Sequence, residues 1–473
     1  MNKEKKEHNN SHHILPHILT EKHIKKQHVE PGKIKELLHQ GKTDRIRRIL
    51  SQLDVSTIAS LINQLSDRYK IKLYLLLPTN VSSDVLLEVS SHSRRVILKG
   101  LKDKYIVSMI QSADSDDSAD ILGEVPKSKV RRIIQRLSRK KKEAVAPLIE
   151  YEEDTAGGLM QTELVSVRKG MTVKEALDYV KKKLREVEGV NYVYVVDSRN
   201  RILGVVSVQR LISEHPNKKI ERVMKRDVVT VDPHMDKEQV ARIFQEHDLI
   251  ALPVVDKKGV LLGRVTADDV MDVITEEATE DMYRIAGLHP EEDVFDPLFS
   301  SVKRRLPWLI INLGTAILAA ITVSLFTDTL QKVVILAAFM PIVAGMGGNA
   351  GTQTLTIVVR SIALNEIRHK DSYRKVLVKE GLTGLINGMA TGIIMAVIAA
   401  LWTKNPAMGV VILLAMMTNM LVAGLVGAAI PIILKKAGVD PAVASSIFVT
   451  TFTDVVGFFS FLGIATLLMN FLI

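Results

Sequence analysis

The last apolar run of the chain, Val443–Ile473, contains a single carboxylate, Asp454. A carboxylate within an otherwise uncharged membrane span costs at least about 2.5 kcal/mol at mid-membrane, so it indicates function. Thr450, Thr451 and Gly457 share a helical face with Asp454 at i−4, i−3 and i+3. This stripe of hydroxyl and carboxylate oxygens predicts the lining of a cation pore. An interhelical hydrogen bond or a position at the membrane surface is the alternative.

A run of proline and small residues interrupts the second apolar stretch, Val333–Val359. The run is Pro341–Gln353, with the sequence PIVAGMGGNAGTQ. Proline and clustered glycine break helices, and a broken helix frees backbone carbonyls, which is tolerated in a membrane where the backbone is buried in protein or lines a wet cavity. Such carbonyls can coordinate cations, so we expect a broken helix at a cation site. Close helix packing through small residues is the alternative.

The available donor atoms narrow the choice of ion. The chain has no cysteine, and none of its histidines lies in an apolar run. Oxygen donors alone favour hard cations such as Mg²⁺, Ca²⁺ and Mn²⁺ over zinc or copper. Mg²⁺ gives up its waters reluctantly and often needs only one or two carboxylates. One Asp454 per subunit fits this chemistry if two subunits meet at a pore.

A strongly acidic stretch, Asp268–Asp296, precedes the first apolar run. Thr275–Ile285 is predicted to be helical, and like charges on one helical face repel each other by a few tenths of a kcal/mol per pair. Divalent cations would neutralise this repulsion, whereas solvent and monovalent counterions are the alternative. Against one arginine, Arg284, the stretch has eleven carboxylates: Asp268, Asp269, Asp272, Glu276, Glu277, Glu280, Asp281, Glu291, Glu292, Asp293 and Asp296.

Five apolar runs are each long enough to cross a hydrocarbon core of about 30 Å. The basic triplet Lys303–Arg305 precedes the first run, and the second–third and fourth–fifth connections are also basic. Positive charge marks the cytosolic side of a membrane protein. This places the soluble part in the cytosol and the C-terminus outside. The runs are Leu306–Phe326, Val333–Val359, Leu382–Trp402, Met408–Leu434 and Val443–Ile473.

The soluble part begins with a basic, His-rich extension over residues 1–30, predicted to be disordered, in which histidines could bind a metal such as zinc. From Pro31 to Glu150 the apolar spacing predicts an array of short helices. Ser115–Val125 is one of them, and Ser128–Leu148 is predicted to form one long basic helix. An acidic knot lies in the former, and helix capping with a solvated face is its alternative explanation. The knot consists of Asp114, Asp116, Asp117 and Asp120.

An internal repeat at an offset of about 59 residues follows, between Gly157 and Ile274. Val195-Val196-Asp197 recurs as Val254-Val255-Asp256, and Gly204–Ser207 recurs as Gly263–Thr266. Each copy is predicted to contain an opening strand, an amphipathic helix and a strand–turn–strand unit. A duplicated module that only dimerises the chain is the bland alternative. The predicted opening strands are Leu164–Val167 and Val228–Val231, and the helices are Val173–Leu184 and Lys237–Glu246.

Several classes of protein find no support in the sequence. The absence of cysteine excludes disulfide frameworks, thiolate zinc sites and cysteine nucleophiles. No nucleophile–base pair or hydrolytic metal motif is present, so the chain is not predicted to be an enzyme. No P-loop pattern is present, which argues against an ATP-driven pump of that type. The net charge of +10 is unevenly distributed, and no nucleic-acid partner is predicted.

In their order, these parts resemble the MgtE-type magnesium transporters. The repeat resembles a tandem pair of cystathionine-β-synthase-type (CBS) domains, and the resemblance covers the chain from about Pro31 onward. Its most specific motifs are EDTAGGLM at Glu153–Met160, the Gly-rich run around Asn349, and Asp440-Pro441 with Asp454. The predicted parts are an extension (1–30), a helical N-domain (31–150), the CBS pair (151–274), an acidic connecting helix (275–302) and the pore domain (303–473).

The resemblance implies a homodimer in the cell membrane, with the pore at the subunit interface. Asp454 matches the family residue that selects hydrated Mg²⁺. Asn349, Thr352 and Thr450 complete the candidate pore site, and Thr352 stands where some members have Asn.

The resemblance further implies that cytosolic Mg²⁺ holds the pore shut by bridging acidic groups of the N-domain, the CBS pair and the connecting helix. The matching positions are Asp116, Asp120, Glu238, Asp248, Asp269, Asp272, Glu277, Glu280, Asp281 and Asp440.

ATP is a second ligand that the family binds, at the CBS pair. Tyr192 matches a base-contacting position, and Thr266 with Asp269 matches the Thr-x-x-Asp pair that holds a ribose. In the first copy Ser207 is followed by Arg210 where a carboxylate is expected, and Gln209-Arg210 departs from the Arg-Asp pair of the family.

The sequence therefore predicts a multidomain membrane protein with an all-α N-terminal superhelical domain, an α/β CBS pair and a five-helix transmembrane domain. Its predicted function is Mg²⁺-selective, channel-like transport gated by cytosolic Mg²⁺. The alternative is a membrane-anchored CBS-domain sensor of nucleotides or ions without transport. Asp454 distinguishes the two, because an anchor has no need of an intramembrane carboxylate.

Overall fold

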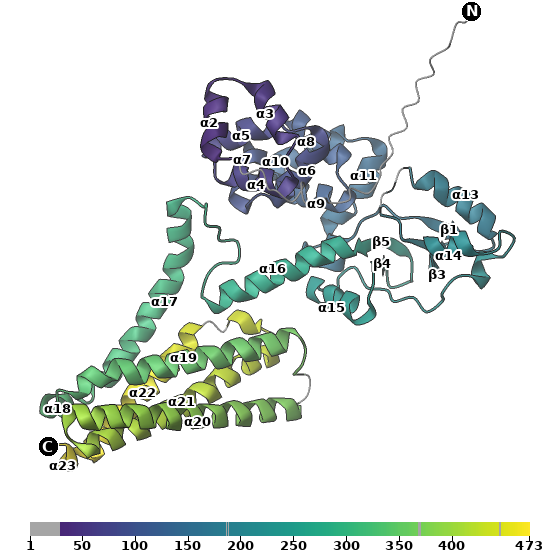
Figure 1. The fold of residues 1–473 in the computed structure, drawn as a ribbon. Coiled ribbons are helices and arrows are strands. Elements are labelled where there is room, and N and C mark those ends of the chain that lie inside the picture. The colour runs from purple at the N-terminus through teal and green to yellow at the C-terminus, as the bar shows by residue number, and fades with distance from the viewer. Residues whose placement is uncertain (1–28, 186, 188, 368–369, 444–445) are drawn as a thin grey trace, which may run out of the picture. The chain divides into compact units, whose positions relative to one another are not determined.

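The computed structural model describes residues 29–185, 187, 189–367, 370–443 and 446–473. Residues 1–28, which make up nearly all of the predicted polar extension, lie outside the described part. The chain divides into two compact units, Met1–Ala267 and Asp268–Ile473, which are described in turn (Figure 1).

The first unit opens with an array of ten short helices among the described residues (Figure 1). Each helix contributes one to three buried apolar residues, such as Ile46, Leu73 and Ile97, to a common core. Polar residues define where several helices start: the side chains of Asp54 and Ser90 accept hydrogen bonds from the backbone N–H groups of Thr57 and Ser93. The helices are α2 (Pro31–His39), α3 (Thr43–Leu50), α4 (Val55–Asn63), α5 (Asp67–Tyr74), α6 (Thr79–Glu88), α7 (Ser91–Gly100), α8 (Asp103–Ser112), α9 (Ser115–Glu124), α10 (Lys127–Arg136) and α11 (Arg139–Val145).

The prediction of one long basic helix over Ser128–Leu148 is wrong. The segment forms α10 and α11, followed by the 3₁₀ turn η1 (Leu148–Glu150). The break falls at Ser138, whose hydroxyl accepts a hydrogen bond from the backbone N–H of Lys141 at 3.3 Å and so starts a new helix. The helical pattern of basic residues continues across Ser138, so the periodicity of the sequence does not mark this cap.

The CBS pair follows as two α/β modules. In the first, β1 (Ser166–Arg168) pairs in parallel with β2 (Tyr192–Val196), which pairs antiparallel with β3 (Ile202–Ser207). In the second, β4 (Ala251–Val255) pairs antiparallel with β5 (Leu261–Thr266). The predicted strand Val228–Val231 is not formed; only Val231 makes an isolated parallel bridge, to Val254. The helices are α12 (Ala156–Leu159), α13 (Val173–Lys183), α14 (Val208–Ser213) and α15 (Lys237–His247), with η2 at Ile220–Arg222.

Backbone hydrogen bonds between the two modules follow the repeat. The amide of Ile202 donates to the carbonyl of Gly259 at 3.0 Å, and the amide of Leu261 donates to the carbonyl of Asn200 at 3.0 Å. Ile202 and Leu261 are equivalent positions of the repeat, as are Asn200 and Gly259. The two hairpin tips therefore make the same hydrogen bond to each other in both directions. The strand–turn–strand part of the predicted repeat is thereby confirmed.

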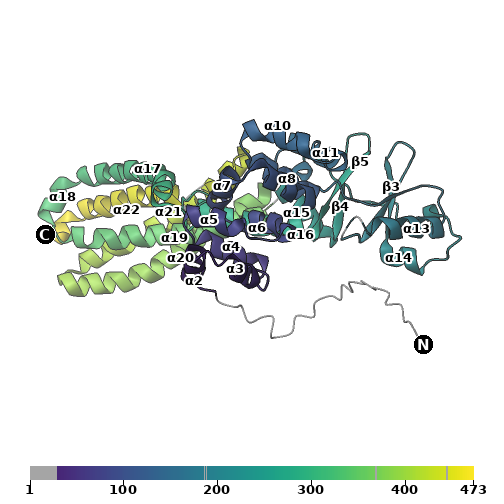
Figure 2. The same ribbon diagram turned by 90° about the horizontal axis from the view of Figure 1, so that it is seen from above.

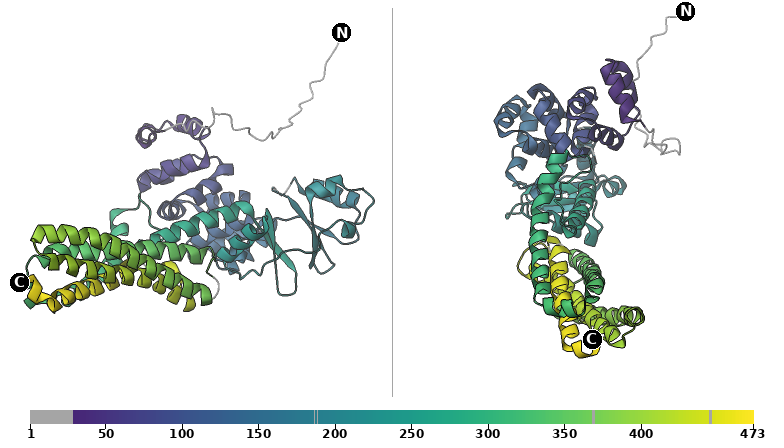
Figure 3. Two further views of the ribbon diagram at one scale, coloured as in Figure 1. Left: turned by 60° about the horizontal axis from the view of Figure 1, so that its bottom comes forward. Right: turned by 90° about the vertical axis from the view of Figure 1, so that its left-hand side faces the viewer.

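The second unit begins with a helix that runs directly out of β5. This helix, α16 (Ala267–Ile285), starts at Ala267 rather than at the predicted Thr275. A stretch without regular structure follows to Pro297, and a bundle of long helices occupies the rest (Figure 2, Figure 3). The elements are α17 (Leu298–Ser324), α18 (Thr327–Lys332), α19 (Leu336–Ala363), α20 (Lys370–Thr403), α21 (Pro406–Lys436), η3 (Pro441–Val443), α22 (Ser446–Leu467) and α23 (Met469–Leu472).

Four of the described helices, α17, α20, α21 and α22, are long and apolar enough to cross a membrane. The fifth long helix, α19, has 28 residues, which exceeds the roughly 20 needed for a span. Its polar and small residues lower its apolarity, but it packs directly against α21 and α22 within the bundle. The five predicted spans thus correspond to five long helices.

The predicted break in the second span is wrong. Helix α19 is continuous from Leu336 to Ala363, with Pro341 inside it. One carbonyl of the Gly-rich run is also engaged by a side chain, because the hydroxyl of Thr352 donates to Gly348 O at 2.9 Å. The glycines serve close packing, which was the alternative explanation.

Glycines bring neighbouring backbones into contact along the bundle. A Cβ atom on Gly388 of α20 would lie 2.9 Å from Met417 Cα of α21, and one on Gly427 of α21 would lie 2.7 Å from the carbonyl oxygen of Gly351 of α19. A Cβ on Gly384 would overlap the carbonyl of Met420. Only glycine permits such distances, so these positions fix how closely the helices approach each other.

The connections between helices separate into two ends of the bundle. At one end, the side-chain amide of Asn405 in the α20–α21 turn donates to Phe471 O at 3.0 Å, and the hydroxyls of Thr329 and Thr466 are hydrogen-bonded at 2.8 Å. At the other end, Arg284 pairs with Asp440. The C-terminus therefore shares the end that has few charges, and the basic connections lie at the opposite end.

We predict that Gly384→Val lowers the thermal unfolding midpoint of the detergent-solubilised protein. The added methyl groups would push α20 away from α21, and overpacking of this kind costs about 1–3 kcal/mol. The control is Gly314→Val on α17, where an added Cβ meets no atom within 4 Å. Circular dichroism against temperature measures the midpoints, and equal effects of the two substitutions would contradict the prediction.

Candidate cation path and acidic clusters

Asp454 lies in the middle of α22, and its side chain is half-buried. One turn earlier, the hydroxyl of Thr450 donates to the carbonyl of Ser446 at 2.9 Å. The hydroxyl of Thr451 donates to the carbonyl of Ile447 at 2.6 Å. Because these hydroxyl protons are used within the helix, the hydroxyl oxygens keep their acceptor capacity. The stripe can therefore accept hydrogen bonds from the water shell of a cation.

The two segments singled out in the sequence pack against each other. A Cβ on Gly348 of α19 would lie 3.3 Å from Thr450 Cγ2 of α22. A Cβ on Gly351 would overlap the side chain of Val449. Thr352 lies one turn beyond Gly348, and both its side chain and that of Thr450 are half-buried. All four predicted pore residues belong to this one pair of packed helices, and three of them, Thr352, Thr450 and Asp454, are half-buried.

Asn349 is exposed on α19 in the single chain. It lies next to Gly348 in the sequence, but its side chain does not share the buried face formed by Gly347 and Gly351. The structure therefore brings Asn349 to the same height of the bundle as Thr450 without burying it.

Two buried polar residues of the bundle were not predicted. Glu380 of α20 is 4% exposed, and it accepts hydrogen bonds from Lys379 Nζ at 2.6 Å and Thr354 Oγ1 at 3.3 Å. Asn419 of α21 is fully buried. The signal for Asn419 was present, because a lone amide in the apolar run Met408–Leu434 obeys the same rule that identified Asp454.

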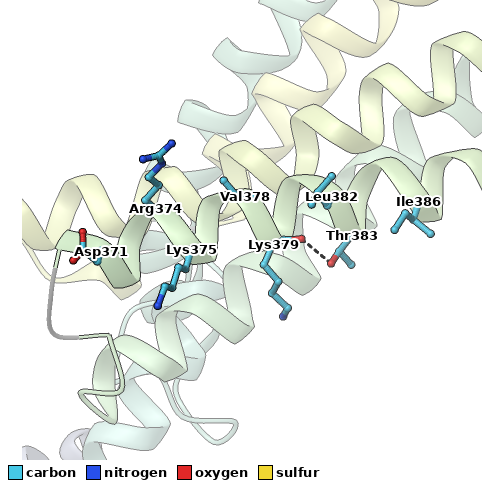
Figure 4. Close-up of a pocket in the computed structure, with 8 residues that line it drawn as sticks. All are labelled: Asp371, Arg374, Lys375, Val378, Lys379, Leu382, Thr383 and Ile386. Atoms are coloured by element: carbon cyan, nitrogen blue, oxygen red, sulfur yellow. Dashed lines mark hydrogen bonds between the residues drawn. The ribbon is translucent and has the colours of Figure 1, made fainter.

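A groove of about 730 Å³ runs along α20 (Figure 4). Its walls include three cationic side chains, Arg374, Lys375 and Lys379, at the basic end of the helix, and apolar side chains such as Leu382 and Ile386 farther along. One helix supplies every lining residue. Three cationic side chains and one carboxylate, Asp371, line the groove, so its net positive charge does not suit a cation path. Asp454 is not among the lining residues.

On the connecting helix α16, an arginine lies between two predicted regulatory carboxylates. The guanidinium of Arg284 forms ion pairs with Glu280, one turn before it, and with Asp440, just before η3. All three side chains are partly buried. An internal cation thus joins α16 to the connection between α21 and α22, and it occupies the space between two groups that were expected to bind Mg²⁺.

The remaining acids of α16 interact unfavourably with each other. Burial raises the pKa of Asp281, and the neighbouring carboxylate of Glu277 raises it further, while Arg284 opposes the shift. Burial likewise raises the pKa of Asp272, with a smaller contribution from Asp268. The carboxylates of Glu277 and Glu280 thus add to the effect of burial on Asp281, and added positive charge would relieve this repulsion.

Arginines that follow the acidic stretch neutralise another part of it. Arg304 Nη1 lies 2.6 Å from Asp296 Oδ2, and Arg305 Nε lies 2.6 Å from Glu292 Oε1. Arg304 Nη1 also donates to the carbonyl of Glu291 at 2.7 Å. The stretch Asp268–Asp296 has eleven carboxylates and one arginine. The fold places two further arginines, from the start of α17, next to these carboxylates.

The acidic knot of the N-domain also has a buried cation beside it. Lys141 is 7% exposed, and its ammonium donates to the carbonyl of Ala113, directly before the knot. Burial lowers the pKa of Lys141, and the carboxylates of Glu163 and then Asp114 counteract this. The hydroxyl of Ser115 donates to Glu163. This contact joins the first residue of α9 to the segment between α12 and β1.

The other predicted regulatory residues are spread over several elements. Asp116 is buried and Asp120 half-buried, one turn apart on α9. Glu238 is exposed near the start of α15, and Asp248, also exposed, ends that helix with a left-handed φ of 51°. Among residues 29–473, leaving aside the six undescribed positions, no three acidic or histidine side chains are grouped so that they could hold a metal ion by themselves.

The predicted nucleotide positions occupy equivalent strand pairs. Tyr192 faces Ser207 across β2 and β3, and Ala251 faces Thr266 across β4 and β5. The aromatic residue is therefore present in one copy and the threonine in the other. In the first copy the Ser207 hydroxyl already caps α14 by accepting from Arg210 N at 3.2 Å. These residues do not fit the ribose-binding pattern at the first copy.

Taken together, these features define a multi-pass membrane protein with an acidic helix that links soluble N-terminal domains to a helical bundle. The sequence matches the family described as MgtE, Divalent cation transporter, over residues 340–464, the MgtE intracellular N domain over 53–154, and the CBS domain over 156–216 and 220–276.

The chain is 33% identical to the magnesium transporter MgtE of Thermus thermophilus over 449 residues, which span 92% of this chain and 98% of the relative. It is 30% identical to that of Bacillus subtilis over 91% of this chain and 95% of the relative. A crystal structure of the cytosolic domain of the Mg²⁺ channel MgtE in complex with ATP covers 52% of this chain at 34% identity, with a TM-score of 0.48. The chain belongs to the MgtE family.

We predict that Arg284→Gln loosens α16 in the absence of divalent cations. Loss of the shared guanidinium leaves Glu280 and Asp440 to repel each other. Hydrogen exchange of the amides in Thr275–Ile285 should accelerate about threefold to tenfold, the range expected for partly exposed ion pairs worth roughly 0.7–1.4 kcal/mol. The control is Arg139→Gln, which removes the exposed pair with Glu143. Unchanged exchange in α16 would contradict the prediction.

The raised pKa values of Asp281 and Asp272 predict a pH dependence of α16. A carboxyl whose folded-state pKa is raised stabilises the fold below its unfolded pKa, and this contribution is lost as pH rises through the folded-state value. Protection of α16 amides, corrected for intrinsic exchange, should therefore increase as pH falls from about 7 to about 5. Asp281→Asn should flatten this trend, whereas Glu143→Gln on α11 should leave it unaltered.

Proposed function

We propose that this chain is a Mg²⁺-selective, channel-like transporter that is gated by cytosolic Mg²⁺. One observation carries the proposal: Asp454 and Thr450 lie one turn apart on a membrane-spanning helix, and the Thr450 end of this stripe packs against the Gly-rich helix α19. Family membership supports it, since the relatives that the chain matches over nearly their whole length are magnesium transporters.

The chemistry of the stripe favours a hydrated hard cation. Asp454 supplies one carboxylate, and Thr450 and Thr451 supply hydroxyl oxygens that remain acceptors. Mg²⁺ holds its waters firmly, so a site can recognise its hydrated form through a small number of carboxylates and hydrogen-bond acceptors. A divalent ion that moves down a potential of about 100 mV gains about 4.6 kcal/mol, twice the value for a single charge. The proposed transport therefore needs no ATP hydrolysis.

A homodimer would complete the proposed path. Only 11% of the apolar window of α17 is buried within the single chain, compared with 50% for α21. Leu309, Ile310 and Leu313 of α17 are exposed, as is Asn349 of α19. Lipid and a second copy are the two environments that suit such a surface, and a polar residue such as Asn349 suits the second copy. Two Asp454 carboxylates would then face one ion.

The proposed gate uses the acids that lie outside the membrane. Glu277, Glu280 and Asp281 repel one another when ionised, and bound Mg²⁺ would supply the missing positive charge and favour the closed arrangement. A shift from 1:99 to 99:1 between two states requires about 5.5 kcal/mol of preference, which several weak sites can provide together. The proposed regulatory residues are Asp116, Asp120, Glu238, Asp248, Asp269, Asp272, Glu277, Glu280, Asp281 and Asp440.

Two cationic side chains neutralise part of the acidic charge at the proposed gate even without Mg²⁺. Arg284 is paired with Glu280 and Asp440 without any metal, and Lys141 lies beside the acidic knot. Mg²⁺ would add to these contacts rather than assemble the acidic regions from nothing. The soluble unit and the basic connections are proposed to be cytosolic and the C-terminus external, in accordance with the distribution of positive charge.

The alternative, a membrane-anchored CBS-domain sensor, accounts for the soluble unit equally well. It does not account for the membrane unit, because an anchor gains nothing from Asp454 and Asn419 in its spans. ATP is bound by a solved relative. We propose no nucleotide step for this chain, since Arg210 replaces the expected carboxylate and the Ser207 hydroxyl caps a helix.

The test is Mg²⁺ influx into proteoliposomes that contain the full chain. Asp454→Ala is expected to reduce influx about tenfold or more, the effect of losing roughly 1.4 kcal/mol or more at the limiting site. The matched control is Asp328→Ala, which removes a carboxylate from the short helix α18 outside the spans. High Mg²⁺ on the cytosolic face should suppress influx in the unmodified chain and the control alike.

Absence of divalent flux in the unmodified chain would overturn the transport proposal in favour of the anchored sensor. Flux that depends on Asp454 but ignores cytosolic Mg²⁺ would overturn the proposed gate alone.

A further inference from the structure

Asn419 occupies the point at which α19, α21 and α22 meet. Its side chain is fully buried on α21, and its amide Nδ2 donates to the backbone carbonyl of Val343 on α19 at 2.8 Å. The orientation of the amide follows from this contact, because the reverse orientation would place two oxygen atoms against each other. A polar side chain thus joins two membrane helices at a buried position.

Glycines on both neighbouring helices make room for this amide. A Cβ on Gly457 of α22 would lie 2.7 Å from Asn419 Nδ2 and 3.0 Å from its Cγ. A Cβ on Gly347 of α19 would overlap Nδ2 and lie 2.7 Å from Cγ. Any larger residue at either position would displace the amide. The side chain is therefore enclosed by two glycine backbones from different helices.

The oxygen of the amide shows that packing alone does not explain this residue. Among the described residues, no hydrogen-bond donor reaches the buried Oδ1 atom. An acceptor buried without a partner destabilises a protein, and leucine would fill a similar volume without that penalty. Buried asparagines are known instead to fix the register of packed helices at a cost in stability, because their hydrogen bond forms in one alignment only.

The register in question is that of the candidate cation path. Gly347 directly precedes Gly348, which packs against Thr450, and Gly457 lies three residues beyond Asp454 on the same face of α22. A slip of α19 against α22 by one turn would move a helix by about 5.4 Å and would separate Thr450 from the Gly-rich run.

We propose that Asn419 is a positioning residue for the cation path. By binding Val343 O and fitting between Gly347 and Gly457, it holds the Gly-rich run of α19 level with the Asp454 turn of α22. The inference rests on the proposed transport function for its effect on selectivity. Its effect on helix register is independent of that function.

The absence of cysteine from the chain allows the register to be measured directly. Cysteines introduced together as Gly348→Cys and Thr450→Cys should form a disulfide under mild oxidation, because a Cβ at position 348 lies 3.3 Å from Thr450 Cγ2. Adding Asn419→Leu, which keeps the volume but removes the donor, should slow this crosslinking about fivefold. Adding Thr418→Val should not, because among the described residues the Thr418 hydroxyl bonds only to Leu414 O of its own helix.

Ion selectivity is the second readout, with the native residues at 348 and 450. In proteoliposomes, Asn419→Leu should lower the ratio of Mg²⁺ to Ca²⁺ influx about tenfold relative to the unmodified chain and to Thr418→Val.

Asn419→Asp adds a readout that altered packing would not produce. A protonated carboxyl can donate to Val343 O and a carboxylate cannot, so its Mg²⁺ influx, as a fraction of the unmodified chain's, should rise as pH falls.

The outcomes separate the two ideas. Slower crosslinking together with lost selectivity in Asn419→Leu supports the inference. Unchanged crosslinking overturns it, whatever the flux, and slower crosslinking with full selectivity overturns the role in the cation path. Slower crosslinking in a chain that carries no Mg²⁺ at all supports the register role while the proposed function fails.

Discussion

At Gly384, Gly388 and Gly427 the backbones of neighbouring membrane helices meet with no side chain between them. The other features of the bundle depend on this close approach. Between helices held so near, an amide such as Asn419 can reach a carbonyl of the next helix, and the hydroxyl stripe of α22 can lie against a glycine surface on α19. Polar groups inside a bilayer are sustainable because protein atoms rather than lipid surround them.

Outside the bundle, electrostatics takes the place of close packing. The acids of α16 and of the stretch before α17 are too numerous to be stable together, and arginines from three positions, 284, 304 and 305, offset part of their charge. Burial is the main cause of the raised pKa values of Asp272 and Asp281, and neighbouring carboxylates raise them further. Added positive charge near these carboxylates would relieve the repulsion that remains.

The fold was largely predictable from the sequence because its signals are local. Apolar length identified the long helices, and the repeat of Val195–Asp197 at Val254–Asp256 identified the CBS pair. What failed depended on single residues or on distant contacts. The cap at Ser138 divided one predicted helix into two, and the Gly-rich run of α19 proved helical because α21 and α22 supply the packing that an isolated glycine-rich segment lacks.

The candidate site was predictable in part for the same reason. Asp454 and Thr450 share a helix, so helical spacing alone related them. The pairing of Arg284 with Asp440 joins residues far apart in the chain, and no pattern in the sequence reports it. Glu380 was overlooked because it lies at the edge of a basic connection, where a carboxylate is unremarkable until its burial against Thr354 is seen.

The hydrogen bonds between the two CBS hairpin tips limit where the protein can accept an inserted domain. Turn residues at positive φ, such as Asn200 and Gly259, usually mark loop tips, and a chain normally accepts an inserted epitope or fluorescent domain at such tips when they are exposed. These two residues are half-buried. Here each tip supplies the carbonyl that the other hairpin needs. An insertion at either position would break the hydrogen bonds that join the two copies, so these turns are poor sites for reporter domains.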